Sequence, residues 1–187
     1  MSDKVPRLEF DELDRDLADA LRPRVERLKY LGEFFKVMGH NPEVLRPFME
    51  MTEALKAALP ENLTEVGALT VAGALGNDYE RHQHERLCEK LGFARSWIAA
   101  VNALEPGAAS EMSETERLAQ SLALALVRSD WPAARTRFDR LVDRVGHAQA
   151  CAFLMLVGRY ATHAMVIKVF DLAPPVASIF APGERSS

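Results

Sequence analysis

The sequence predicts an all-α protein with a single domain of about eight or nine helices, and two observations support this class. Apolar residues recur three or four positions apart along most of the chain, which is the spacing of one face of a helix. No segment shows the apolar–polar alternation that is typical of a half-buried strand. A length of 187 residues with 48% hydrophobic residues suits one domain with a substantial core.

Three amphipathic helices are expected first, over residues 10–21, 28–38 and 42–59. Apolar residues line one side of each, and residues that interrupt helices separate them. Pro23 is expected to end the first helix because proline cannot donate a backbone hydrogen bond. Pro42 is well placed as the first residue of the third helix.

Residues 63–75 form the most apolar stretch, and Glu65 is its clear exception. A helix that is apolar on all sides is a buried helix. Gly76 and Asn77 make a corner into a further helix, which runs to about Leu91. The sequence therefore predicts a buried central helix followed by a more polar neighbour.

The second half of the chain predicts several more helices. A short one surrounds Trp97, and Ser113 begins the next with a capping box that Glu116 completes. Another helix ends at Gly146, and a long helix with a nearly all-apolar first half follows over residues 148–172.

The helical domain is predicted to span residues 28–175, with a helical extension over 1–27 and a tail over 176–187. The helices at 63–75 and 148–172 look too apolar for the surface of an isolated monomer. An extended apolar surface usually marks a subunit interface. The protein is therefore expected to form a homo-oligomer.

Composition and charge argue against several kinds of partner. A net charge of −4 and a pI near 5.8 do not suit nucleic-acid binding, which needs a basic face. The charged N-terminus does not resemble a secretory signal, and no uninterrupted apolar run approaches the roughly 20 residues that span a bilayer. Cys88 and Cys151 form no Cys-x-x-Cys pair and are both expected in the core. We expect a cytoplasmic protein with a small-molecule substrate and no nucleic-acid or membrane partner.

Glu80 and His84 are the first candidate catalytic residues, because positions four apart share one face of a helix. Glu65 is the third, since burial in an apolar helix disfavours the charged form of a carboxyl group and suits it to proton exchange. If the three converge, they can transfer protons to and from a substrate. Tyr160 and His163 lie on the last helix and could line the pocket, but a role in the core or at an interface is favoured.

Each candidate also has a purely structural interpretation. Asn62 begins a cap-x-x-Glu pattern that ends at Glu65, and a second such pattern runs from Asn77 to Glu80. Either glutamate is therefore a candidate helix cap. His84 is alternatively a buried histidine that is satisfied by Glu80 alone.

Further polar residues of the same segment are candidates for lining a pocket: Asn77, Tyr79, His82 and Cys88. His82 is two positions from Glu80 and so points to another side of the helix. Glu80, His84 and Cys88 share a face, but the spacing of a recognised zinc site is missing. We therefore expect no metal and no cofactor.

These residues resemble the carboxymuconolactone decarboxylase and alkylhydroperoxidase D-like superfamily. The resemblance covers the chain from about Leu31 to Pro174, and its centre is Gly-Asn-Asp-Tyr-Glu-Arg-His-Gln-His at residues 76–84. It implies a helical fold that assembles as trimers or hexamers. The peroxidase branch of the family has a glutamate upstream of a Cys-x-x-Cys-x-x-x-His motif, and these match Glu65 and, for the final histidine, His84.

Both cysteine positions of that motif differ here. Asn77 stands at the first and Glu80 at the second, and neither side chain can act as a thiolate. The lactone decarboxylase branch also lacks the cysteines and keeps a glutamate and a histidine at the positions of Glu80 and His84. That branch decarboxylates a small oxo-lactone acid without a cofactor.

The first hypothesis is therefore a cofactor-free lyase or isomerase-like enzyme that acts on a small oxo-acid or lactone. His84 would donate or accept the proton, Glu80 would orient it, and Glu65 would be a buried relay or a neighbour of a substrate carboxyl group. One alternative is a peroxidase-like antioxidant protein with Cys88 as its only local thiol. Another is a non-catalytic helical oligomer that binds a ligand.

Overall fold

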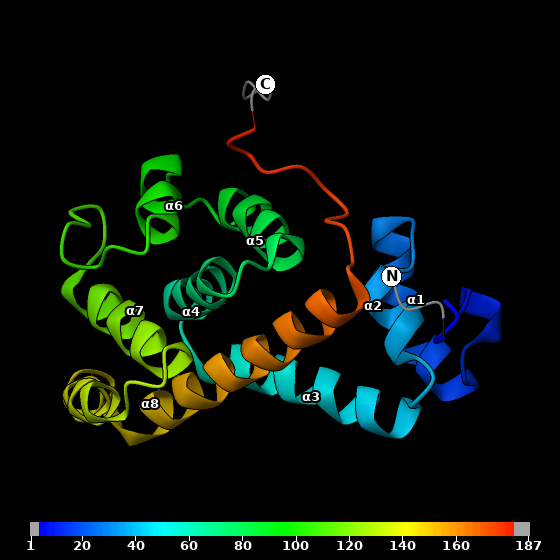
Figure 1. Ribbon diagram of the computed structural model, residues 1–187, viewed down its shortest axis with the longest axis horizontal. Helices are drawn as coiled ribbons and strands as arrows, with labels where there is room; N and C mark the ends of the chain where they lie inside the picture. The colour runs from blue at the N-terminus through cyan, green and yellow to red at the C-terminus, as the bar shows by residue number, and fades with distance from the viewer. Residues whose placement is uncertain (1–3, 182–187) are drawn as a thin grey trace.

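The computed structural model describes residues 4–181, and this part of the chain is helical without any strand (Figure 1). The all-α prediction is confirmed. The elements are η1 (Phe10–Glu12), α1 (Arg15–Leu28), α2 (Glu33–Met38), α3 (Pro42–Ala58), α4 (Glu61–Ala74), α5 (Asp78–Lys90), α6 (Arg95–Asn102), α7 (Glu114–Val127) and α8 (Trp131–Phe170).

Helix α4 lies at the centre of the core, as its apolar sequence predicts. It packs against α5, α7 and α8. A Cβ atom at Gly67 would stand only 2.8 Å from the side chain of Leu156, so glycine allows α8 to approach closely. Because other helices of the same chain cover α4, its apolar surface does not call for a subunit interface, and that part of the argument for an oligomer was wrong.

Helix α8 consists of two helical segments that meet at Gly146. The backbone of Gly146 has φ 80° and ψ 167°, which interrupts the helix where the sequence predicts a break. The second segment crosses the molecule diagonally and ends beside α1 and α2 (Figure 1). Its outward face is apolar and exposed at Met155, Met165 (65% exposed) and Val169 (70% exposed).

By length and composition, α8 is also apolar enough to cross a membrane, which the short apolar runs of the sequence did not predict. A core helix meets the same criterion, and 44% of the apolar window is buried inside the protein.

The N-terminal helices differ from the prediction. The residues around Phe10 form the short η1, and the side chain of Asp14 caps a separate helix, α1. This helix continues through Pro23, which lies on an exposed face where water can satisfy the carbonyl that loses its partner. Lys29 then adopts φ 65° and ends α1, so the predicted helix over 28–38 begins only at α2.

A second apolar cluster joins these N-terminal helices to the rest of the chain. It contains Leu17 and Leu21 of α1 and Phe34 of α2, together with Tyr79 of α5 and Ile167 of α8. Helices α1 and α2 therefore lie over one end of α5 and α8. The domain boundary at residue 27 remains a prediction.

Candidate functional site

The structure brings together the three residues that the sequence predicts as catalytic. Glu65 of α4 and His84 of α5 form a pair in which Glu65 Oε2 lies 2.6 Å from His84 Nδ1. Glu80 Oε2 lies 3.3 Å from the other ring nitrogen, His84 Nε2. All three side chains are buried, and Glu65 is only 2% exposed.

The interpretation of Glu65 as a helix cap is wrong. Helix α4 begins at Glu61, with Pro60 before it, which leaves Glu65 inside the helix. The side chain of Asn62, the predicted cap, instead donates to Glu116 Oε1 over 2.8 Å. The carboxylate of Glu65 is therefore free of any capping role and is directed at His84.

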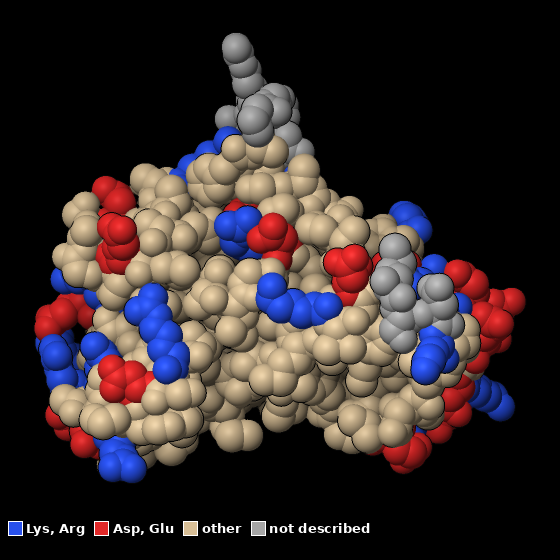
Figure 2. Space-filling model, viewed as in Figure 1, with Lys and Arg blue, Asp and Glu red and all other residues tan. Residues whose placement is uncertain are grey.

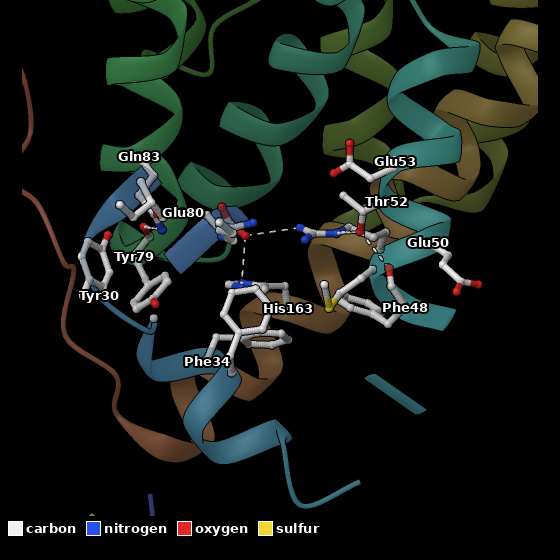
Figure 3. A pocket seen from close by; sticks show the side chains of 16 residues that line it. Tyr30, Phe34, Phe48, Glu50, Thr52, Glu53, Tyr79, Glu80, Gln83 and His163 are labelled. Atoms are coloured by element: carbon white, nitrogen blue, oxygen red, sulfur yellow. Dashed lines mark hydrogen bonds and ion pairs between the residues drawn. The ribbon is translucent and has the colours of Figure 1, made fainter. Parts of the chain in front are cut away.

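Glu80 also does not act as a cap. Asn77 Oδ1 accepts a hydrogen bond from the backbone N–H of Glu80 at 3.3 Å, as the sequence predicts. The carboxylate of Glu80 does not accept the reciprocal hydrogen bond of a capping box from the backbone N–H of Asn77. It extends into the protein instead. Its Oε1 lies 3.1 Å from His163 Nε2, a contact drawn as a dashed line in Figure 3. The same oxygen lies 3.3 Å from Arg159 Nη1.

Three residues from two consecutive turns of α8 complete this network, and the sequence analysis missed most of it. Arg159 was not proposed at all, and Tyr160 and His163 were considered for the pocket but preferred for the core or an interface. Both are buried, and Tyr160 belongs to the core cluster. In the structure, Tyr160 Oη lies 3.1 Å from His84 Nε2 and His163 contacts Glu80. The signal was present, because Arg159 and His163 are four residues apart and follow a nearly all-apolar stretch of the helix.

The surroundings of His84 favour its protonated form. Burial alone would lower the pKa of the ring, but Glu65 and Glu80 outweigh burial and raise the pKa to about 9. His84 is therefore an imidazolium at neutral pH, and it donates from both ring nitrogens. Burial raises the pKa of the neighbouring Tyr160 hydroxyl, so that group keeps its proton.

His163 is neutral at the same pH. Burial lowers the pKa of His163 to about 4, and Glu80 opposes this only in part because Arg159 and His84 are close. The neutral ring can donate from Nε2 to Glu80 and accept at Nδ1 from Asn77 Nδ2, which lies 3.4 Å away. This assignment is consistent with both contacts.

Glu80 is held as a carboxylate. Burial would raise its pKa, but contacts with His163, His84 and Arg159 together lower the pKa well below its usual range. Arg159 is itself fixed, because its Nε donates to Thr52 Oγ1 over 2.9 Å. The network therefore contains a buried acid, His84, and a buried anion, Glu80, in direct contact.

A cavity of about 390 Å³, which we call the chamber, adjoins this network between α2, α3, α5 and α8 (Figure 3). Five Phe and Tyr side chains line it, and one of them, Phe34, stacks on His163 with ring centroids 4.3 Å apart. The guanidinium of Arg159 lies 5.0 Å from the ring centroid of Phe48. The polar groups that reach the chamber include Glu80, His163 and Arg159, whereas Glu65 is not among its lining residues. Glu65 therefore does not contact a ligand in the chamber.

The four candidate pocket residues fall into two groups. Tyr79 lines the chamber, and burial raises the pKa of its hydroxyl to about 12. The other three lie elsewhere. Asn77 is buried against His163, and His82 Nδ1 contacts the carbonyl oxygen of Val176 at 3.1 Å on the other side of α5, as its sequence position predicts.

Cys88 lies behind the site, with Sγ 3.5 Å from Glu65 Oε2. Burial and the nearby Glu65 raise the pKa of this thiol, so it stays protonated. The prediction that both cysteines are buried holds for Cys88 and was wrong for Cys151, which lies on the exposed face of α8. Among residues 4–181, no group of three or more His, Cys, Asp or Glu side chains is arranged to hold a metal ion.

The fold and site define an all-helical protein with a buried carboxylate–imidazole network beside an aromatic chamber. No protein-family model matches the sequence, and a search of curated proteins finds no relative. Similar solved structures exist, and all of those below are less than 25% identical to this chain.

The first is the debrominase Bmp8 without ligand, with a TM-score of 0.77 and 19% identity over 94% of each chain. A cysteine-to-alanine variant of Bmp8 in complex with 2,3,4-tribromopyrrole has a TM-score of 0.72 and 20% identity over 92% of each chain. An alkylhydroperoxidase AhpD core protein from Ralstonia eutropha JMP134, described as peroxidase-related, has a TM-score of 0.76 and 14% identity over 92% of this chain and 94% of that chain. The protein therefore has the alkylhydroperoxidase D-like fold that its sequence predicts.

Proposed function

We propose that this protein is a cofactor-free acid–base enzyme of the lyase or isomerase type that acts on a small oxo-acid or lactone. The observation that carries this proposal is the position of Glu80. Its carboxylate reaches the chamber and at the same time lies 3.3 Å from the protonated ring of His84. A substrate that contacts Glu80 in the chamber is thus separated from the buried proton donor, His84, only by the side chain of Glu80.

If the reaction is the decarboxylation of an oxo-acid, four residues of the site have separate roles. The electron pair of the breaking carbon–carbon bond moves toward the oxo group as carbon dioxide leaves, and the cation of Arg159 stabilises the resulting enolate charge. A proton from His84 then passes through Glu80 to the carbon, and solvent returns a proton to His84. Glu65 keeps the ring of His84 charged and oriented from behind.

The peroxidase alternative has less support from the site. Cys88 is fully buried, and its thiol pKa is raised, whereas a peroxidatic cysteine needs an accessible thiolate. The binding-protein alternative would be favoured by a chamber that neighbouring side chains fill. The chamber is open instead, and Arg81 pairs with Asp78 at 2.7 Å and does not line it.

Turnover can be tested with a panel of small oxo-acids and lactones in deuterated water, followed by proton NMR. The substitution Glu80→Gln keeps the size of the side chain and removes the carboxylate, and we expect it to lower turnover by about 10²–10⁴-fold. Glu89→Gln is the control, because Glu89 lies on the same helix and pairs with Arg95 outside the chamber. Equal turnover of the Glu80→Gln variant and the wild type would refute the proposal.

We also propose that the protein forms a homo-oligomer through the second segment of α8. The support is the exposed apolar face at Met155, Met165 and Val169. Figure 2 shows that few charged side chains lie on the lower middle of the viewed face, over α8 and α3. Association would remove this apolar area from water.

A further inference from the structure

A second hollow of about 410 Å³, which we call the basic cleft, opens beside the chamber. The two share Arg24, Leu28, Tyr30, Glu80 and Gln83 as lining residues, so they are neighbouring parts of one depression. His84, which does not line the chamber, lines the basic cleft. The proton donor of the proposed reaction thus borders the basic cleft directly and the chamber only through Glu80.

The basic cleft has an unbalanced charge. Five cationic side chains line it, and they come from three helices: Arg24 and Arg27 of α1, Lys56 of α3, and Arg86 and Lys90 of α5. Among the described residues of this lining, Glu80 is the only carboxylate, and Arg159 and His84 already compensate it. Arg86 already has contacts of its own, one of them with the carbonyl oxygen of Ala177. Within the described part of the chain, an anion in the cleft would still meet the other cations and no uncompensated carboxylate.

Helix dipoles account for part of this arrangement. Arg27 and Lys90 each lie in the last turn of a helix, where a cation is favourable even without a ligand. The dipole does not explain why the last turns of α1 and α5 line the same hollow as Lys56 of α3. Among the described residues, Arg27 and Lys90 form no ion pair, whereas Lys56 pairs with Glu53 at 3.2 Å.

We propose that the basic cleft binds an anionic end of the substrate, a carboxylate or phosphate group, while the aromatic chamber takes its apolar body. This inference rests on the proposed function and names the class of its substrate: an amphipathic anion. Arg24 suits the boundary between the two parts, because its guanidinium lies 4.9 Å from the ring centroid of Phe35 in the wall of the chamber.

The anion site can be tested without turnover, by backbone amide NMR titrations with inorganic phosphate and with acetate at constant ionic strength. We expect saturable shifts in the last turns of α1 and α5. The double variant Arg27→Gln, Lys90→Gln should weaken binding by about fivefold or more. The matched control is Arg135→Gln, Arg140→Gln, which removes two exposed arginines of α8 and should leave binding unchanged.

Each outcome is decisive. Tighter binding of phosphate than of acetate assigns a phosphate-bearing end, and the reverse assigns a carboxylate. Shifts that do not saturate, that lie elsewhere, or that are the same in the double variant overturn the proposal. Because no turnover is needed, failure of the Glu80→Gln assay would refute the acid–base function and leave this result standing. If a substrate acid is found, equal KM values for the acid and its methyl ester would also overturn the assignment.

Discussion

The substitution Glu65→Gln tests the electrostatic basis of the site. In the folded protein, Glu65 and Glu80 raise the pKa of His84 to about 9 from an ordinary value of 6.5. This difference corresponds to about 3 kcal/mol of stabilisation of the protonated ring. Glu65 is the stronger of the two, and glutamine keeps its size but not its charge. We expect the pKa of His84 in this variant to fall to its ordinary value or below.

The sign of the effect on stability follows from the raised pKa. A histidine with a raised pKa contributes stability that is complete below pH 6.5 and is lost as the pH rises through about 9. Glu65→Gln should therefore lower the free energy of unfolding by about 2–3 kcal/mol at pH 6. At pH 10 the loss should shrink to about 1 kcal/mol, the scale of one hydrogen bond.

Two measurements check this prediction: nitrogen-15 NMR titration of the His84 ring, and urea unfolding at pH 6 and pH 10. Glu61→Gln is the matched control, because Glu61 is an exposed residue of the same helix. The reasoning is refuted if His84 of the variant still titrates near pH 9, or if the loss of stability is the same at both pH values.

Three further predictions concern other parts of the molecule. The pKa of His163 is lowered to about 4, so as the pH falls this histidine is protonated in the unfolded chain before it is protonated in the folded protein. Urea unfolding should therefore show the free energy of unfolding decreasing as the pH drops from 6.5 toward 4. A His163→Asn variant whose free energy of unfolding depends on pH in the same way would contradict this. In the native protein, a thiol reagent should label Cys88 only on unfolding; prompt labelling of Cys88 would show that this thiol is accessible. Light scattering should show that the 20.8 kDa chain forms an oligomer, and the double variant Met155→Glu, Met165→Glu should be a monomer. A wild-type protein that is monomeric at micromolar concentration would exclude the interface.

Local patterns were sufficient to predict most of the helices. The central helix α4 is apolar on every side, so its burial does not depend on which helices cover it. The break at Gly146 and the capping box from Ser113 to Glu116 are likewise written in a few neighbouring residues. Pro23 was misjudged, because the cost of a proline in a helix depends on whether water reaches the carbonyl that loses its partner.

Local sequence patterns predicted only part of the site. Glu80 and His84 were found because they are four apart on one helix, which is a local relation. Their partners Arg159, Tyr160 and His163 are more than 70 positions away along the chain, and only the packing of α8 brings them within contact. The packing of α4 against α5 likewise makes Glu65, a candidate cap in the sequence, the partner of His84.

The sequence by itself determined an all-helical chain, its buried central helix and the acid–imidazole pair of α5, because helix periodicity and i, i+4 spacing are properties of short segments. Only the tertiary structure decided the charges of that pair, the aromatic chamber and the cationic cleft beside it. These depend on distances between helices that are far apart in sequence, and a pKa or a cavity exists only once those helices have packed together.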